Sequence, residues 1–363
     1  MADGLSFAIL GGYGQLGRGV AALLLDRGAD RVTIAGRSLE KAGKAAKDLA
    51  GRDCAGHVVS ERADADDVDA LADLLSSHDV VIHAAPLDSV APRTMCEALA
   101  RAGGRLVLVS HGTDAIAGLQ AARPRLEQAG AKMVVDTGAD PGLPGLVGHL
   151  AAENHGAAEG VEIAARYRAP EVGRAGLADI LDGGTEAAWV YADGWRRAGL
   201  FEVRRRAWPG GLGASLAIPI YLPELDALRA RHNLRGLTLW HGGLNHIADA
   251  IVSLRRFMGT FLPKKIALAA IEASMRYTNR PPYGLSIVGV ARGGGRTVRV
   301  ALSHNDVYAA TAEIVIWCAE RLALDHQRKS SFCFAFELLN DANPIQELRE
   351  SGFNVMINPS MNA

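Results

Sequence analysis

Short apolar runs alternate with amphipathic segments over the first 140 residues of the chain. The apolar runs are rich in Val, Ile and Leu, as buried parallel strands are, and they cover residues 32–35, 57–60, 80–84, 106–110 and 132–137. Between these runs, the spacing of apolar residues predicts helices at 39–49, 68–75, 92–102 and 116–128. This βαβ order predicts an α/β fold of Rossmann type, a doubly wound parallel sheet with its ligand beyond the carboxyl ends of the strands.

The pattern changes after about residue 150. Short or alternating apolar runs predict strands at 161–168, 215–220 and 237–240, and a hairpin that joins 285–291 to 297–302. Helices are expected at 184–195, 246–257 and 265–275, followed by a long one from Asn305 to about Asp325 with Asn305 or Asp306 as its N-cap. These elements predict a second α+β domain that contains a mainly antiparallel sheet.

Composition narrows the class of protein. A chain of 363 residues that is 49% hydrophobic and 22% charged is typical of a globular protein with about two domains. The formal charge of -1 gives no support for nucleic acid or an anionic membrane as a partner. The four cysteines are far apart and include no Cys-x-x-Cys pair, which predicts neither a disulfide framework nor a zinc site. Because no apolar run approaches the roughly 20 residues of a membrane span, and the N-terminus has no basic flank or cleavage region, we expect a cytoplasmic protein.

A glycine-rich turn follows the first apolar run, 7–10, and precedes an apolar, helix-like segment. Gly12, Gly14 and Gly17 satisfy the pattern G-x-G-x-x-G, in which the first glycine allows a tight turn, the second lets the backbone approach a pyrophosphate, and the third lets the helix pack on the strand. The pyrophosphate is expected at the helix N-terminus. We therefore predict a dinucleotide site, rather than a simple glycine-rich turn, with the contacting residues Gly12, Tyr13, Gly14, Gln15 and Leu16.

The end of the second predicted strand indicates which dinucleotide binds. NAD-binding chains usually place an Asp or Glu about 20 residues after the glycines, whereas this chain has Gly36, Arg37 and Ser38. A guanidinium and a hydroxyl suit a 2′-phosphate, which predicts NADP as the cofactor. The alternative is that Arg37 only caps a surface turn. Asp64 is placed to hydrogen-bond near an adenine, or it belongs to an acidic surface loop.

Two further strand ends open into the same predicted crevice. Ala84, Ala85 and Pro86 are compact enough for a ribose or nicotinamide to lie against the backbone, although a tight βα turn has the same composition. Ser110 and His111 leave the next strand, and Ser110 is assigned to the cofactor. His111 is a candidate proton donor to a reduced substrate; the alternative is a histidine that is only solvated or hydrogen-bonded.

Asp140 followed by Pro141 predicts a helix start, because the carboxylate can cap free N–H groups and proline is tolerated at the first helical position. That role is compatible with a substrate or nicotinamide contact. We assign His111 as the proton donor and Asp140 as the organiser of the catalytic site.

Polar residues of the second domain are candidates for holding an amino-acid-like substrate. Arg166 and Arg168 alternate on a predicted strand and share a face, so both can point at one carboxylate. Arg174 adds a cation near the polar segment 182–186. For each of them the alternative is a solvated surface role. The two histidines of the turn 240–246 are five residues apart, the wrong spacing for one helical face, and no metal is predicted.

Six segments in order resemble the saccharopine dehydrogenase-like family of NAD(P)-dependent reductases: 11–17, 35–41, 80–86, 138–142, 307–312 and 343–352. The resemblance spans nearly the whole chain. It implies a Rossmann domain at 1–145 that is interrupted by a substrate or dimerisation domain at 146–302 and completed by 303–363. It also implies nicotinamide-dependent formation or cleavage of a C–N bond at an amino-acid carbon, through an imine.

Departures from the family pattern refine this expectation. Pro86, Leu87 and Asp88 replace the Gly-Pro-Phe-like loop of many relatives, which favours another reductase of the same fold over saccharopine chemistry itself. The chain has no Tyr-x-x-x-Lys, Gly-x-Ser-x-Gly or His-Glu-x-x-His motif. We therefore expect an NADPH-dependent reductase of an imine or related small-molecule substrate. The alternatives are a carbonyl or enoyl reductase and a non-catalytic NADP sensor, and a homodimer is compatible with the second sheet.

Overall fold

The computed structural model describes residues 4–51, 57–87, 91–109, 112–173, 176–178, 180–181, 189–199, 202–258, 261–325, 331–339 and 343–361. The chain divides into two compact units: Met1–Leu143 with Tyr308–Ala342, and Pro144–Val307 with Asn343–Ala363. Besides small shifts at the two boundaries, one longer segment differs from the predicted division. Asn343–Ala363, expected in the first domain, groups with the second, because its strand β16 (Asn354–Met361) pairs antiparallel with β14 (Arg296–His304).

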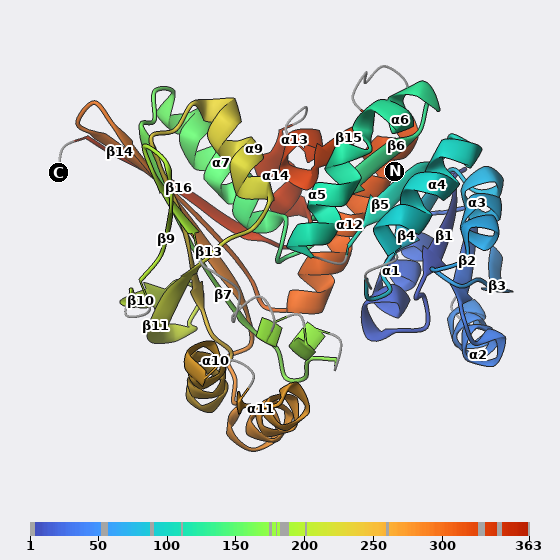
Figure 1. Cartoon of the computed structure of the whole chain (residues 1–363), viewed down its shortest axis with the longest axis horizontal. Coiled ribbons are helices and arrows are strands. Elements are labelled where there is room, and N and C mark those ends of the chain that lie inside the picture. The colour runs from blue at the N-terminus through green and yellow to red at the C-terminus, as the bar shows by residue number, and fades with distance from the viewer. Residues whose placement is uncertain are drawn as a thin grey trace. The chain divides into compact units, whose positions relative to one another are not determined.

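The first unit is built on a parallel sheet of seven strands in the order β15-β6-β5-β4-β1-β2-β3 (Figure 1). The strands are β1 (Ser6–Leu10), β2 (Arg31–Gly36), β3 (His57–Arg62), β4 (Val80–His83), β5 (Arg105–Leu108), β6 (Lys132–Val135) and β15 (Phe332–Phe334). Strands β1 to β6 have the 3-2-1-4-5-6 order of a Rossmann sheet, and β15 extends the β6 edge. The predicted fold class is confirmed.

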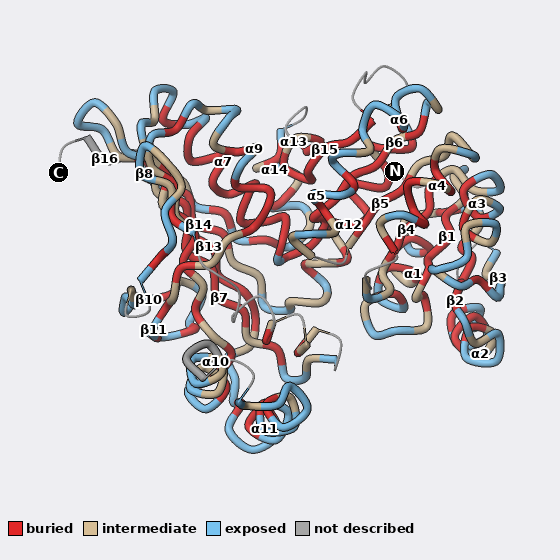
Figure 2. Tube along the Cα trace, viewed as in Figure 1, coloured by how far each residue is buried: buried red, intermediate tan, exposed pale blue. Residues whose placement is uncertain are grey.

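Helices pack against this sheet, and its central strands are buried (Figure 2). They are α1 (Gln15–Asp26), α2 (Leu39–Ala50), α3 (Val68–Ser77), α4 (Ala91–Ala102), α5 (Thr113–Ala121), α6 (Arg123–Gln128), α12 (Val307–Leu324) and α13 (Ala335–Leu338). The single helix predicted at 116–128 is wrong. Pro124 stands in the first turn of α6, and proline is tolerated there but not in a helix interior, so α5 ends and α6 begins at this point.

The second unit contains a sheet in the order β10-β11-β12-β7-β13-β14-β16, with β8 paired to β12 and β9 paired to β8. Its remaining strands are β7 (Gly160–Arg168), β8 (Trp189–Ala192), β9 (Trp195–Arg197), β10 (Arg204–Trp208), β11 (Gly213–Ile220), β12 (Gly236–Gly242) and β13 (Gly284–Gly293). Only β7 and β12 are parallel among the described pairs. The predicted mainly antiparallel sheet and the β13–β14 hairpin are therefore confirmed.

The helices of the second unit are α7 (Leu143–His155), α9 (Glu224–His232), α10 (His246–Met258), α11 (Lys264–Thr278) and α14 (Pro344–Glu350). Helix α7 packs against both the sheet and α9 at Gly148, where a Cβ would be 2.7 Å from Ile163 Cδ1 and 2.8 Å from Leu228 Cδ2. Ile163 points toward α7. Because side chains alternate along a strand, Arg166, three residues further on, points to the opposite face of β7. No described helix is both long and apolar enough to cross a membrane.

The helix predicted at 184–195 is wrong over its described part. Residues 182–188 lie outside the described residues, and the rest forms β8 and β9, joined by a turn in which Asp193 has φ 51°. Trp189, Val190 and Tyr191 are aromatic or β-branched and favour a strand, and Tyr191 pairs with Leu237 of β12. Pairing with a distant strand therefore decides the structure of this segment.

Candidate functional site

The glycine turn leaves the N-terminus of α1 open to a ligand. Gly14 is the N-cap of α1 and offers no side-chain cap, and the first turn of this helix contains no acidic residue. Helices α2 and α3 differ, because Ser38 and Asp67 cap their backbone N–H groups and each has an acid in its first turn. Uncapped N–H donors at an exposed helix N-terminus are what a phosphate requires.

Each glycine of the motif has its own structural reason. A Cβ at Gly17 would lie 2.5 Å from Gly11 O and 2.7 Å from Gly12 Cα, so Gly17 is needed for close packing of α1 on the turn. A Cβ at Gly12 would lie 2.8 Å from Ile9 O. At Gly14, which is exposed, a Cβ would meet only Gly11 O at 3.2 Å. A side chain at Gly14 would thus point into the space that a pyrophosphate takes in this motif, and the turn fits a dinucleotide.

The end of β2 carries the predicted 2′-phosphate residues. Gly36 is required by Tyr13, whose Cε1 would lie 2.4 Å from a Cβ at that position. Arg37 is exposed and forms no ion pair with any described residue. Ser38 Oγ accepts a hydrogen bond from Lys41 N at 3.3 Å and caps α2. An uncommitted guanidinium beside a helix N-terminus fits a phosphate group.

The neighbouring strand adds a cation that the sequence did not indicate. Arg62, the last residue of β3, is the register partner of Gly36 and is exposed. Only the pairing of β2 with β3 brings it beside the predicted 2′-phosphate residues. Asp64 is exposed in the following loop, where its Oδ1 accepts a hydrogen bond from Asp66 N at 3.3 Å.

The loop after β4 lies against the glycine turn. A Cβ at Gly11 would be 2.9 Å from Ala85 N and 3.0 Å from Ala84 C, so only glycine allows this approach. Pro86 follows and is exposed. The structure therefore brings Ala84 and Ala85 next to the predicted pyrophosphate site, as their place at the end of β4 suggested.

Ser110 and His111 lie outside the described residues. Val109, which precedes them, donates its N–H to His83 O at 3.1 Å, so the chain leaves β5 beside the end of β4. His83 is fully buried, and burial lowers its pKa to about 4. It is therefore neutral at neutral pH.

The helix start predicted at Asp140 and Pro141 is wrong, because the helix begins further along the chain. Helix α7 begins at Leu143, and Pro144, rather than Pro141, stands in its first turn. The loop after β6 first folds back on itself: Gly142 has φ 121°, and a Cβ there would lie 2.4 Å from Asp136 O. Asp140 is exposed in this loop, which leaves the same edge of the sheet as the other strand ends.

In the second unit, Arg166 and Arg168 lie two residues apart on β7 and share a face. Arg166 is 2% exposed and donates from Nη1 to Leu212 O at 3.1 Å. Burial, and then repulsion from Arg168, lowers the pKa of Arg166. Arg168 donates to Arg280 O at 3.4 Å. The Nε atoms of both arginines are buried with no hydrogen-bond partner among the described residues, which do not include Arg174.

Asp249 is a second charged group of this region, and the sequence did not indicate it. It lies in the first turn of α10, and its Oδ1 would be 1.6 Å from a Cβ at Gly243, so the carboxyl group rests against that glycine. Burial raises the pKa of Asp249 to about 6, while the charges of Arg166, His241 and His246 act in the opposite direction. In the sequence, the feature that pointed toward Asp249 was the polar turn 240–246, which leads into α10.

Arginines of β7 and β10 on this face of the sheet are in two different states. Arg204 and Arg206 each lie 2.8 Å from a carboxylate oxygen of Glu162 and stack on Trp240. The two β7 arginines form no ion pair with any described residue. Ser286, the register partner of Arg166, has a buried Oγ without a partner among the described residues. The end of β7 and the adjoining part of β13 thus offer two Nε donors and one hydroxyl that have no partner among the described residues. The carboxyl group of Asp249 lies near Arg166.

Comparison with protein families gives one match, which lies within the first unit. Residues 7–130 match the family model described as the saccharopine dehydrogenase NADP binding domain. The match is confined to the first unit, where it agrees with the family resemblance seen in the sequence and supports NADP as the cofactor. A search of curated proteins gave no match.

A solved structure matches the whole chain. Saccharopine dehydrogenase (L-Glu forming) from Saccharomyces cerevisiae has a TM-score of 0.67 and 17% identity, over 98% of this chain and 100% of that chain. At this identity the match shows the fold. Pen from Bacillus thuringiensis has a TM-score of 0.31 and 13% identity, over 37% of this chain and 50% of that one. A short chain dehydrogenase from Mycobacterium smegmatis has a TM-score of 0.32 and 18% identity, over 37% and 75%.

Proposed function

We propose that the chain is an NADPH-dependent reductase of an imine, or a related C–N substrate, derived from an amino acid. The observation that supports it most is the pair of buried Arg166 and half-buried Arg168, which forms no ion pair with the described residues. Arg166 lies close enough to Asp249 for the two charges to interact. A substrate that carries a carboxylate and a nitrogen cation would complement both kinds of charge.

The two arginines bind the substrate carboxylate and fix its orientation. Their unsatisfied Nε donors, together with Ser286 Oγ, supply hydrogen bonds that the fold itself leaves unused. Asp249, with its pKa of about 6, is mostly ionised at neutral pH and accepts a hydrogen bond from the substrate N–H. Holding both ends of the substrate supplies orientation, which is a large part of many catalytic effects.

Bound NADPH supplies a hydride. A protonated imine is already an electrophile, so the chain has to provide only modest acid assistance. His111 is our proposed proton donor, and Asp140, exposed in the loop after β6, is our proposed organiser of the same site.

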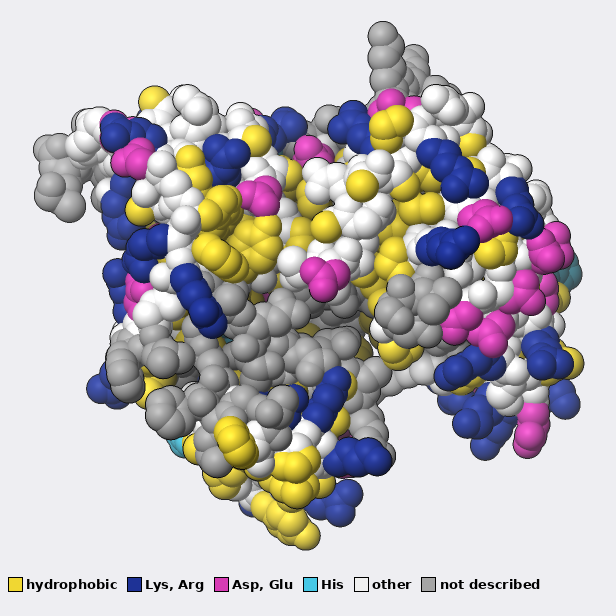
Figure 3. Space-filling model, in the orientation of Figure 1, with side chains coloured by type: hydrophobic (Ala, Val, Ile, Leu, Met, Phe, Trp, Pro, Cys, Tyr) yellow, Lys and Arg dark blue, Asp and Glu magenta, His cyan; other side chains and the backbone are white. Residues whose placement is uncertain are grey.

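Two observations favour further parts of the proposal. Exposed apolar side chains on or between α10 and α11 favour a homodimer: Ile247, Leu254, Phe261, Ile266 and Tyr277. Hydrophobic side chains gather over α11 in Figure 3. Among the described residues Cys96, Cys318 and Cys333 form no disulfide, which favours a reducing compartment such as the cytoplasm.

The test is oxidation of NADPH with a matched set of substrates. An imine that bears a free carboxylate should be reduced, whereas its methyl ester, the corresponding ketone and an enoyl thioester should react slowly or not at all. Faster reduction of the ketone or the thioester would instead support a carbonyl or enoyl reductase. Tight binding of NADPH without turnover of any compound would support a non-catalytic sensor.

A further inference from the structure

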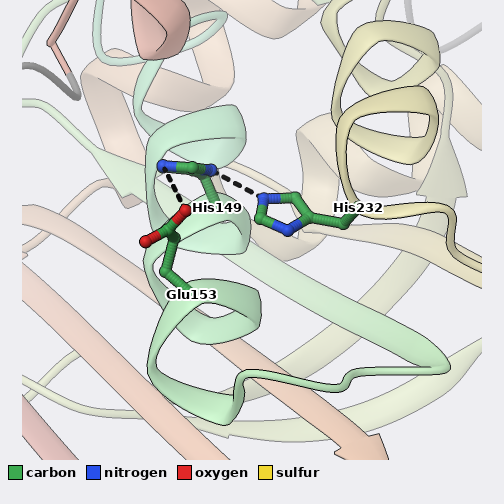
Figure 4. A group of neighbouring side chains, drawn as sticks. All are labelled: His149, Glu153 and His232. Carbon is green, nitrogen blue, oxygen red and sulfur yellow. Dashed lines mark hydrogen bonds and ion pairs between the residues drawn. The ribbon is translucent and has the colours of Figure 1, made fainter.

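Two helices of the second unit bring two histidines and a glutamate together (Figure 4). His149 and Glu153 are one turn apart on α7, and His232 is the last residue of α9. His149 Nδ1 lies 2.7 Å from His232 Nε2, and His149 Nε2 lies 3.9 Å from Glu153 Oε1. One possible ligand atom from each residue lies within 4.8 Å of the others. The cluster contains none of the residues assigned to NADP or to the substrate.

The three side chains have the chemistry of a metal site. Two imidazoles and one carboxylate form a ligand set that proteins use for zinc, with a fourth position left for water. The carboxylate offsets part of the ion's charge.

An ion requires side-chain rotation, because the candidate ligand atoms lie up to 4.8 Å apart. Zn–N bonds are about 2.0–2.1 Å, so tetrahedral ligand atoms lie about 3.3 Å apart. The separations of 2.7 and 3.9 Å involve opposite nitrogens of His149, and an ion takes only one of them, so His232 and Glu153 have to turn toward that nitrogen. His149 is fully buried and therefore fixed, whereas the side chain of Glu153 is 51% exposed and has room to turn. The exposed side of the cluster leaves space for a water ligand.

We propose that His149, His232 and Glu153 form a site for a divalent transition metal ion, of the Zn²⁺ or Co²⁺ class. The ion ties the last turn of α9 to α7 on the face of the second sheet opposite to Arg166. Because the metal binds only the folded cluster, it stabilises the chain. This site does not depend on the proposed reductase function.

The test is titration of the full chain with Co²⁺ after treatment with a chelator. Bound Co²⁺ should give the intense visible absorption of a four-coordinate ion at one equivalent, and Zn²⁺ should remove it. His232→Ala should weaken binding by at least about 100-fold, because loss of an outer partner alone costs about 10–100-fold. Glu153→Gln should weaken it by about 10-fold, since the amide keeps an oxygen but loses the charge.

His57→Ala is the matched control, because His57 is an exposed histidine of the first unit. It should leave Co²⁺ binding and the Zn²⁺-induced rise in melting temperature unchanged. Co²⁺ that stays six-coordinate and pale, or equal binding by His57→Ala and His232→Ala, would overturn the proposal. The contact between His149 and His232 would then be a structural hydrogen bond only.

Discussion

The candidate ligand sites of the two units are built from different groups. The first unit has an open turn of backbone and small residues, with Gly14 at an uncapped helix end and Arg37 exposed beside it. The second unit has buried charge: Arg166 is 2% exposed, and burial raises the pKa of Asp249. The difference teaches that a site made of backbone follows from a local sequence pattern, whereas a site made of buried charge exists only after distant strands and helices have assembled.

Gly14→Val should break the first unit's site completely. A valine side chain would occupy the space of the pyrophosphate, while a Cβ at this position meets only Gly11 O at 3.2 Å, so the protein should still fold. We expect no measurable NADPH binding and a nearly unchanged melting temperature. The control is Gly19→Val on the same helix, where a Cβ meets no atom within 4 Å and binding should persist. Normal NADPH affinity in a folded Gly14→Val protein would place the phosphate elsewhere.

Arg166→Met should impair the second unit's site without touching the first. A hydrogen bond to a charged group is worth about 1.5–3 kcal/mol, which corresponds to a rise in KM of roughly 10–150-fold for a carboxylate substrate. The KM for NADPH should not change. Arg204→Met is the matched control, since Arg204 is already paired with Glu162 at 2.8 Å. An equal rise in KM for both variants would remove Arg166 from substrate binding.

Asp249→Asn should lower activity yet make the protein more stable at neutral pH. Folding raises the pKa of this carboxyl from 3.8 to about 6, so the fold disfavours its ionised form. The resulting loss of stability sets in as pH rises from about 4 to 6, and it reaches up to about 3 kcal/mol at neutral pH.

Denaturant unfolding of both proteins at pH 7 and pH 4 checks the Asp249 prediction. The gain of the Asn variant should be largest at pH 7 and mostly lost at pH 4. Asp193→Asn is the contrast, because this exposed carboxylate is paired with Arg235 at 2.8 Å and gains nothing by neutralisation. A variant of Asp249 that is less stable at pH 7 would show that the ionised carboxylate is well paired in the fold.

The sequence predicted the local parts of this molecule well. The glycine turn, the parallel sheet and the absence of an acid after β2 depend on residues close together in the chain. Prediction from the sequence failed where tertiary contacts determine the local structure. Strand β8 forms because it pairs with β12, and the loop before α7 folds back before the helix begins. Asp249, Arg62 and the pair His149 and His232 carry no local motif. They become candidates only through the contacts that α10, β3, α7 and α9 make.

Fluorescence titration of NADPH and NADH into the wild-type chain, Arg37→Ala and Arg166→Met tests the division of roles between the two units most directly. Loss of a charge-assisted bond should weaken NADPH binding to Arg37→Ala by roughly 1–3 kcal/mol and leave NADH nearly unchanged. Arg166→Met should bind both cofactors as the wild type does. Equal losses for NADPH and NADH in Arg37→Ala, or a loss of NADPH affinity in Arg166→Met as large as in Arg37→Ala, would contradict the account.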